Sequence, residues 1–323
     1  MIKVLITGGA GFIGSIVARE MLARGYSVRV FDNLLHNNGS SLLSYLSATN
    51  FEFYHGDIRD KTYCLEATRD IDFVIHLAAI VGDPASQKDP ELTSGTNLNG
   101  SYNMIDASQK NKVKKFIFVS TCSNYGKIDT SAMANEESLL NPISLYAKTK
   151  VEIEEHLIEN ENGLDWTILR LATAYGVSPR MRFDLTINDF TAQMYQNKTL
   201  LVYGEQFWRP YVHIQDIAEG IFLVMSKSDL TRHEIYNIGD TDENYRKIDV
   251  VNLIRQYIPS SEIKFVSKLE DPRDYRVCFD KAREQLGLEP KWTVNDGVEE
   301  VIKILKTQII VDVENSVYYN DQS

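Results

Sequence analysis

The stretch "TGGAGFIG", Thr7–Gly14, joins a short apolar run to a stretch with helical periodicity, "IGSIVAREMLAR" (13–24). Its glycines recur every third residue, at Gly8, Gly11 and Gly14. Glycine permits a tight turn and lets a phosphate group approach the backbone at a helix N-terminus, where free N–H groups and the helix dipole favour an anion. The stretch therefore predicts a strand, a turn and a helix that together hold the diphosphate of a dinucleotide.

An acidic residue, Asp32, ends the next apolar run, eighteen residues after Gly14. A carboxylate there accepts hydrogen bonds from the adenosine ribose and repels a 2′-phosphate, so NAD is favoured over NADP. Asn33 comes next, and no arginine follows in "FDNLLHNN". Asp57, in "GDIRD" (56–60), ends the third apolar run, and we expect it beside the adenine.

The first half of the chain alternates short apolar runs with helical stretches such as "TNLNGSYNMIDASQKN" (96–111). The predicted strands are residues 3–7, 26–32, 51–57, 71–79, 114–120 and 165–172. These runs are almost continuously apolar, as expected of a parallel sheet covered on both faces. Repeated βα units with right-handed crossovers predict an α/β fold with a Rossmann-type doubly wound parallel sheet.

Composition narrows the classes of partner. The formal net charge of −11 argues against nucleic acid or an anionic membrane surface as the main partner. The three cysteines lie far apart and the six histidines lack metal-site spacing, so we expect no disulfide framework and no metal. No apolar run approaches the ~18 residues of a membrane span, and "MIKVLIT" predicts a strand rather than a signal peptide. A reduced, cytoplasmic setting is expected.

A tyrosine and a lysine stand four residues apart in "ISLYAKTK" (143–150), at Tyr146 and Lys150. Residues at this spacing share one face of a helix. A lysine cation favours the ionised form of a nearby phenol and lowers its pKa from about 10, which would suit proton transfer near neutral pH. Surface helices often carry the same pair, so its meaning depends on the motifs around it.

These motifs resemble those of the extended short-chain dehydrogenase/reductases, in particular the NAD-dependent nucleotide-sugar epimerase/dehydratase family. The resemblance covers about residues 2–305 and follows the order of the family's motifs. The matching stretches are "TGGAGFIG" (7–14), "GDIRD" (56–60), "HLAA" (76–79), "TNLNG" (96–100), "VSTCSNYG" (119–126), "YAKTK" (146–150), "LRLATAYG" (169–176) and "RPYVHIQD" (209–216). The resemblance implies an enzyme with NAD as its cofactor and a nucleotide-diphosphate sugar as its substrate.

The resemblance also implies a division of labour along the chain. Residues 1–175 would form an NAD-binding Rossmann domain that carries the catalytic residues, and residues 176–310 a smaller domain that mainly binds the nucleotide sugar. The change of rhythm near residue 176 agrees, because loops lengthen there and aromatics and arginines cluster in "VYGEQFWRPYVHIQD" (202–216). Residues 311–323 are expected to form a frayed tail.

Catalytic and cofactor roles follow from the resemblance. Tyr146 matches the catalytic tyrosine, which takes a proton from a sugar hydroxyl while hydride leaves the same carbon for NAD. Lys150 matches its partner, which also holds the nicotinamide ribose, and Thr121 matches the residue that hydrogen-bonds the reacting hydroxyl. The residues expected at NAD are Gly8, Gly11, Phe12, Ile13, Gly14, Asp32, Asn33, Asp57, Ile58, Leu77, Ala78, Ala79, Asn97, Tyr146 and Lys150.

The residues expected at the substrate are Thr121, Thr173, Asn188, Arg209 and Arg273. In the family pattern Asn188 opens a helix near the phosphates and Arg209 pairs with them, which suits arginine because its planar fork binds phosphate oxygens bidentately. Arg276 is the alternative to Arg273 for a second phosphate contact. Arg180 and Arg182, in "SPRMRFD", are further candidates.

Two departures from the family pattern bear on the reaction. Members that eliminate water across C5–C6 of the sugar carry an Asp–Glu pair directly after the threonine, where this chain has Cys122 and Ser123. Elimination needs a general base and a general acid, so a 4,6-dehydratase is disfavoured. Thr173 stands where many relatives have asparagine, so the substrate edge is expected to be recognised differently.

The leading hypothesis is therefore a 4-epimerase working through transient C4 oxidation with bound NAD. The alternative is a nucleotide-sugar 4-dehydrogenase that releases a 4-keto sugar, since both need the same oxidation half-reaction. A ketoreductase would ordinarily use NADPH, which Asp32 disfavours, and a non-catalytic NAD(H)-binding module would ordinarily lack the Tyr–Lys pair. The nucleotide and the sugar stay open. A homodimer paired through helices near 97–110 and 145–160 is expected from the resemblance.

Overall fold

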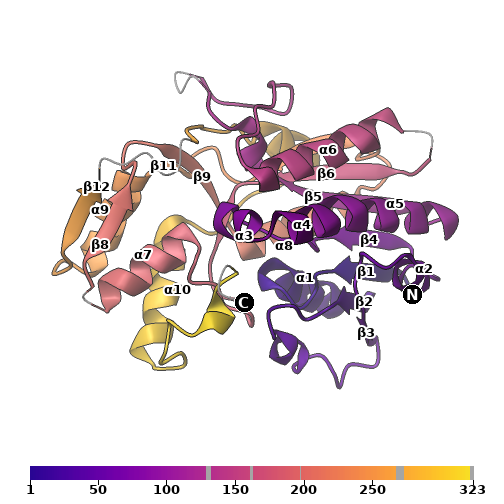
Figure 1. The fold of residues 1–323 in the computed structure, drawn as a ribbon, viewed down its shortest axis with the longest axis horizontal. Helices are drawn as coiled ribbons and strands as arrows, with labels where there is room; N and C mark the ends of the chain where they lie inside the picture. Colours follow the sequence, from indigo (N-terminus) through magenta and orange to yellow (C-terminus); the bar gives the residue numbers. More distant parts are fainter. Residues whose placement is uncertain (129–131, 161–162, 197, 267–272, 321–323) are drawn as a thin grey trace.

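The computed structural model describes residues 1–128, 132–160, 163–196, 198–266 and 273–320 (Figure 1). Its main layer is a seven-stranded sheet of order β10-β6-β5-β4-β1-β2-β3, with every neighbouring pair parallel. The strands are β1 (Lys3–Thr7), β2 (Ser27–Asp32), β3 (Phe51–His55), β4 (Phe73–His76), β5 (Lys115–Thr121), β6 (Trp166–Leu171) and β10 (Glu234–Ile238). The order places β1 and β4 side by side at the reversal point of a doubly wound sheet. The predicted Rossmann-type sheet is confirmed.

Helices cover both faces of this sheet. They are α1 (Phe12–Ala23), α2 (Lys61–Ala67), α5 (Ser101–Lys110), α6 (Leu145–Glu159) and α8 (Ile214–Ser226). Leu5 and Ile6, adjacent on β1 and fully buried, belong to different cores: Ile6 packs in the core that α1 and α8 cover, and Leu5 in the core that α2, α5 and α6 cover. Because successive side chains of a strand point to opposite faces, an unbroken apolar strand fills both cores.

The second half of the chain builds a smaller lobe, seen at the left of Figure 1. It holds a three-stranded sheet of β11-β9-β7 and a pair, β12-β8. Their bounds are β7 (Thr173–Tyr175), β8 (Leu200–Tyr203), β9 (Trp208–His213), β11 (Asn244–Arg246) and β12 (Ile263–Val266), and the lobe's helices are α7 (Thr186–Tyr195), α9 (Lys247–Tyr257) and α10 (Val294–Lys306). The remaining short elements are η1 (Gly39–Leu42), α3 (Asp83–Lys88), α4 (Pro90–Ser94), η2 (Gly95–Gly100), η3 (Cys122–Tyr125), η4 (Ala282–Leu286) and η5 (Ser316–Tyr318).

The lobes do not separate cleanly at residue 175. β10 pairs with β6 in the central sheet, and α8 packs on α1, although both come from the range 176–310. The second half therefore completes the Rossmann layer before it builds its own lobe. No helix among the described residues is long and apolar enough to cross a membrane.

The described part of the expected tail, 311–320, is packed rather than frayed. Val313 is buried in a cluster with Phe183, and the ring of Tyr318 meets that of Phe183 edge-on at 5.6 Å between centroids. The backbone N–H of Asn320 donates to Asp184 Oδ2 at 3.2 Å. Burial of these apolar side chains outweighs the entropy that a free chain end would keep. Residues 321–323 lie outside the described residues.

Candidate functional site

A large pocket opens at the carboxyl ends of the parallel strands, where ligands bind in doubly wound sheets. One wall is the Rossmann layer: the glycine turn after β1, the ends of β2 and β5, the loop after β4 and the catalytic face of α6. The other wall comes from the second half of the chain, through segment 171–174, segment 180–186, and single residues further on. The pocket therefore lies between the two lobes.

The glycine turn closes so tightly that side chains are excluded. A Cβ on Gly14 would lie 2.2 Å from the carbonyl oxygen of Gly8. Gly8 itself has φ +68°, and a Cβ there would lie 2.9 Å from the amide nitrogen of Ala78. Gly11 is the N-cap of α1 and gives no side-chain cap, so the first-turn N–H groups have no capping side chain, and residues 11–14 line the pocket. This cradle fits the diphosphate of a dinucleotide.

Asp32 lies at the other end of the cradle. Its carboxylate accepts hydrogen bonds from the backbone of Ala10 (3.0 Å) and Leu34 (2.8 Å), and burial raises its pKa against their effect. Asp32 and Asn33 are both among the residues that line the pocket. The carboxylate of Asp57 bonds to Arg59 (2.7 Å) and to Asn33 (3.0 Å). Its predicted contact with the adenine stays a prediction.

Most of the other predicted cofactor residues line the pocket, namely Gly8, Gly11, Phe12, Ile13, Gly14, Ile58, Leu77, Ala78, Ala79, Tyr146 and Lys150. Asn97 is an exception. It is buried in η2, where its Oδ1 accepts from Ile80 N–H (2.8 Å) and its Nδ2 donates to Ile80 C=O (3.0 Å) and to Thr149 Oγ1 (3.2 Å). Asn97 thus ties the loop after β4 to α6 and does not face the predicted ligand.

The three predicted catalytic residues, Thr121, Tyr146 and Lys150, all line the pocket. Tyr146 and Lys150 occupy one face of α6, which begins after Ser144, whose Oγ accepts from Ala147 N–H at 3.2 Å. Thr121 ends β5, and a side-chain hydrogen bond joins it to Tyr146. The ammonium of Lys150 donates to the carbonyl of Val119 on the same strand, at 2.8 Å. The fold therefore brings together three groups that the sequence places up to 29 positions apart.

Burial dominates the electrostatics here. It raises the pKa of the Tyr146 phenol, opposed by the Arg182 cation and the Thr121 hydrogen bond. It also lowers the pKa of Lys150 to about 7, opposed by the Glu154 carboxylate. The sequence predicted that Lys150 would lower the pKa of Tyr146, but in this structure desolvation raises that pKa and Arg182 is the leading cation against it.

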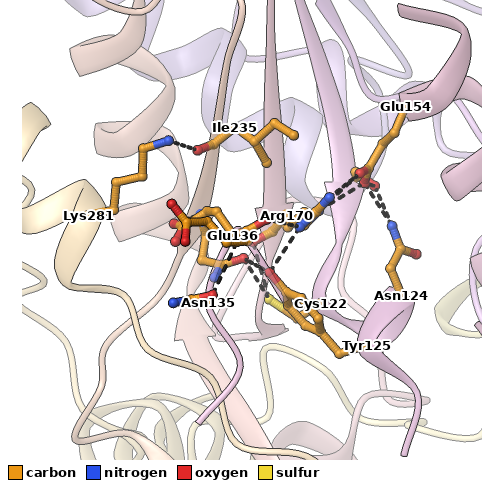
Figure 2. A network of polar contacts seen from close by, with 12 residues as sticks. Cys122, Asn124, Tyr125, Asn135, Glu136, Glu154, Arg170, Ile235 and Lys281 are labelled. Atoms are coloured by element: carbon orange, nitrogen blue, oxygen red, sulfur yellow. Dashed lines mark hydrogen bonds and ion pairs between the residues drawn. The ribbon is translucent and has the colours of Figure 1, made fainter. Parts of the chain in front are cut away.

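Behind the catalytic residues lies a buried polar network, drawn in Figure 2. The guanidinium of Arg170, on β6, meets the carboxylate of Glu154, on α6, at 2.7 Å, and both side chains are almost fully buried. Glu154 also accepts from Asn124 (2.8 Å) and from Ser120, while Arg170 donates to Tyr125 Oη at 3.1 Å. The network holds α6 on β5 and β6 through Glu154, which lies one helical turn after Lys150.

Two arginines of the second half reach the pocket as predicted. Arg209 is buried and donates to the backbone carbonyls of Trp208 (2.6 Å) and Arg273 (2.5 Å). Arg273 pairs with Asp83 (3.1 Å), on the opposite wall. Arg276 stacks over Trp208, 5.2 Å from its ring centroid, and does not line the pocket. Of the two alternatives, Arg273 faces the ligand space.

Asn188 requires a correction. Its side chain is fully buried and does not line the pocket. Its amide donates to the carbonyls of Gly176 (3.1 Å) and Arg182 (2.9 Å), and its Oδ1 accepts from Gly176 N–H (3.2 Å). These bonds shape the loop before α7, and the predicted phosphate contact does not fit this position. Thr173 lines the pocket as predicted.

The two positions after Thr121 differ in environment. Cys122 is buried away from the pocket, its Sγ lies 3.3 Å from the carbonyl oxygen of Arg170, and burial raises its pKa well above the usual range. Ser123 faces the pocket and contacts Arg273 at 3.3 Å. Neither side chain is a carboxylic acid, so this part of the wall offers no acid–base pair of the Asp–Glu kind.

Sequence reasoning missed several lining residues: Asp184, Tyr275 and Asn320. None lies in a recognisable motif, and Asn320 belongs to the segment expected to be a free tail. Asp184 follows Arg182 by two residues and binds it at 2.8 and 2.7 Å. That spacing in "SPRMRFD" was the one local signal available.

The comparisons with known proteins identify the family of the chain. The model of the NAD dependent epimerase/dehydratase family matches residues 4–239. The UDP-glucose 4-epimerase of Bacillus subtilis is 29% identical over 329 residues, covering 92% of this chain and 94% of that protein. The UDP-glucuronic acid 4-epimerase of Bacillus cereus, solved with UDP-glucuronic acid and NAD, is 28% identical with a TM-score of 0.84, covering 95% and 99% of the two chains. DesIV of Streptomyces venezuelae, a dTDP-glucose 4,6-dehydratase solved with NAD, is 27% identical with a TM-score of 0.85, covering 95% and 98%.

Proposed function

Because the chain belongs to the NAD dependent epimerase/dehydratase family and its cofactor is NAD, we propose that it is a 4-epimerase of a nucleotide-diphosphate sugar. The observation that carries the proposal is the meeting of Thr121, Tyr146 and Lys150 in a pocket whose wall lacks an acid pair after Thr121. The cradle and Asp32 would hold NAD, and the arginine-lined second wall would hold the nucleotide diphosphate.

NAD bound in this cradle supplies reversible hydride transfer with the sugar's C4. Tyr146 would accept the C4 hydroxyl proton, and Thr121 would orient that hydroxyl through the hydrogen bond that it now shares with the phenol. Lys150 would stabilise the phenolate from the same face of α6. For epimerisation the keto sugar would turn in the pocket, so that the hydride returns to the other face of C4 while Tyr146 returns the proton to the C4 oxygen.

The ion pairs of the pocket walls support reversible oxidation over elimination. The carboxylates of Asp83 and Asp184 are ion-paired to Arg273 (3.1 Å) and Arg182 (2.7 Å). Burial acts to raise the pKa of Asp184, but the Arg182 cation outweighs it and lowers that pKa, so Asp184 is a poor proton donor, while Asp83 is engaged by Arg273. We therefore do not assign either residue as the general acid that loss of a sugar hydroxyl would need.

The test is to incubate the purified protein with UDP-, GDP- and dTDP-sugars without added cofactor and to follow NADH at 340 nm and sugar configuration by NMR. Catalytic appearance of a C4 epimer with no net NADH is the expected result. A single-turnover rise in NADH with a keto sugar and no epimer would instead make the protein a 4-dehydrogenase that needs a second oxidant.

Tyr146→Phe is expected to lower turnover by about 10²–10⁴-fold, because positioned proton transfer contributes that much. Its NADH affinity should stay within about twofold of the wild type, since the ring is kept. Tyr63→Phe, at an exposed position of α2, is the matched control and should change neither quantity. Full turnover by Tyr146→Phe would contradict the assignment and would favour a non-catalytic NAD-binding role.

We also propose that the protein pairs with a second copy through α5 and α6. Tyr102 of α5 meets His156 of α6 edge-on, with ring centroids 4.8 Å apart, and donates to Glu152 at 3.0 Å. Ile158, on the same helix as Glu152, is 39% exposed. Light scattering during size-exclusion chromatography should give twice the chain mass of 36.8 kDa; a monomer mass would refute the pairing.

A further inference from the structure

Arg180 is a buried cation, two of whose nitrogens have no hydrogen-bond partner within the part of the chain that the structure describes. Its side chain is 5% exposed and lines the pocket. Within the described residues, neither Nε nor Nη2 of Arg180 has a hydrogen-bond partner. Buried guanidinium groups are ordinarily paired, because an unpaired buried charge costs several kcal/mol. An orphan of this kind that faces a pocket indicates that a ligand anion completes it.

The backbone of Arg180 is fastened to the glycine cradle. Ser178 Oγ donates to the carbonyl of Phe12 (2.7 Å) and shares a hydrogen bond with Ser15 Oγ (3.0 Å), both in the first turn of α1. The N–H of Arg180 then donates to Ser178 Oγ at 3.3 Å. A segment of the second half thus sits directly beside the helix end that fits a diphosphate.

The charged neighbours of Arg180 leave its charge unsatisfied. Asp184, the nearest acid along the chain, is occupied by Arg182 through two hydrogen bonds of 2.8 and 2.7 Å. Asp32 interacts with Arg180 only through space, and its two oxygens are held by backbone N–H groups. Burial lowers the pKa of Arg180 to about 10, and Arg182 acts in the same direction. At neutral pH the guanidinium is still charged.

We propose that Arg180 binds the diphosphate of NAD opposite the N-terminus of α1, so that the second half of the chain clamps the cofactor against the Rossmann half. Two kinds of donor would bind the diphosphate in this arrangement: the backbone N–H groups of the helix end and the planar guanidinium of the arginine. Such a clamp would favour an enzyme that retains NAD through its cycle. The inference requires NAD binding only and does not depend on the epimerase proposal.

The test is binding, measured without any sugar. Arg180→Met should raise the Kd of NADH and of ADP-ribose by about 10- to 100-fold, the range of a hydrogen bond to a charged group. The Kd of adenosine, measured by competition, should not change, because adenosine lacks the diphosphate. Arg255→Met, an exposed arginine of α9, is the matched control and should leave all three values unchanged.

A second readout separates a ligand-binding role from a structural one. Removal of an unpartnered buried cation also removes its desolvation cost, so cofactor-free Arg180→Met should unfold in urea at the same or a higher midpoint than the wild type. A lower midpoint together with an unchanged NADH Kd would make the arginine structural and would overturn the proposal.

Three further outcomes would also overturn it. An equal loss of adenosine affinity would place Arg180 at the adenosine site. A larger loss for NADPH than for NADH would place it at the ribose 2′-position. An unchanged NADH Kd with weaker binding of a UDP-sugar would assign it to the substrate, the role that the sequence suggested.

Discussion

Arg170 and Arg180 are ten positions apart and almost equally buried, at 3% and 5% exposure, yet their surroundings are opposite. Arg170 lies on β6, and its guanidinium forms an ion pair with Glu154 and donates a hydrogen bond to Tyr125 (Figure 2). Arg180 lies in the loop beyond β7 and has orphan nitrogens that face the pocket. Burial lowers the pKa of both; for Arg170 the attraction of Glu154 more than reverses this, whereas the pKa of Arg180 falls to about 10.

The difference separates two uses of a buried charge. Around Arg170 every partner is supplied by the protein, so the network fixes how α6 sits on β5 and β6 and thereby positions Tyr146 and Lys150. Arg180 lines the pocket, and its Nε and Nη2 have no hydrogen-bond partner among the described residues, so we expect a ligand to bind them. Three experiments break or sharpen this comparison.

The largest expected effect comes from breaking the paired network. Glu154→Ala leaves Arg170 buried without its counter-ion, so the free energy of unfolding should fall by about 3–5 kcal/mol, measured by urea denaturation. Glu155→Ala, at an exposed position of the same helix, should change it by less than about 0.5 kcal/mol. Replacing the pair together, as Glu154→Leu with Arg170→Met, should cost less than Glu154→Ala. If the double variant lost as much free energy of unfolding as Glu154→Ala, the unpaired Arg170 charge would not explain the effect of Glu154→Ala.

The second effect is on cofactor-dependent stability. At a concentration of one hundred times Kd, NAD should stabilise the wild type by about 2.7 kcal/mol. At the same concentration Arg180→Met should lose about 1–2 kcal/mol of that gain, if its Kd rises 10- to 100-fold. The measurement is the shift of the urea midpoint with and without NAD. Equal shifts in the two proteins would remove the distinction between the two arginines.

The smallest effect concerns Lys150, a third buried cation, which is held by one carbonyl. Its folded pKa, about 7, lies below the unfolded value of about 10.4. Between these values the unfolded chain binds more protons, so stability rises with pH. From pH 7 to pH 8, cofactor-free wild type should gain about 1 kcal/mol relative to Lys150→Met. A parallel pH dependence of the two proteins would show that Lys150 keeps its proton.

The fold was predictable where the signal was local. The glycine turn, the acid after β2 and the unbroken apolar strands each follow from a few adjacent residues, and the structure contains all three. The spacing of Tyr146 and Lys150 likewise predicted that they would share a face of α6. The side chain of Asn188 was not predictable in this way: it matches a family position, but it bonds to the backbone of Gly176 and Arg182 and does not face the ligand space.

The sequence by itself determined the strand–turn–helix cradle, the preference for NAD at Asp32, and the Tyr146–Lys150 pair, because each depends on backbone geometry within a few residues. Only the tertiary structure decided that the second half contributes β10 to the sheet and that residues 311–320 pack beside the pocket. It also decided which of two arginines has a partner. Partners far apart in the chain are chosen by packing, and whether a buried charge is satisfied depends on all the elements that surround it.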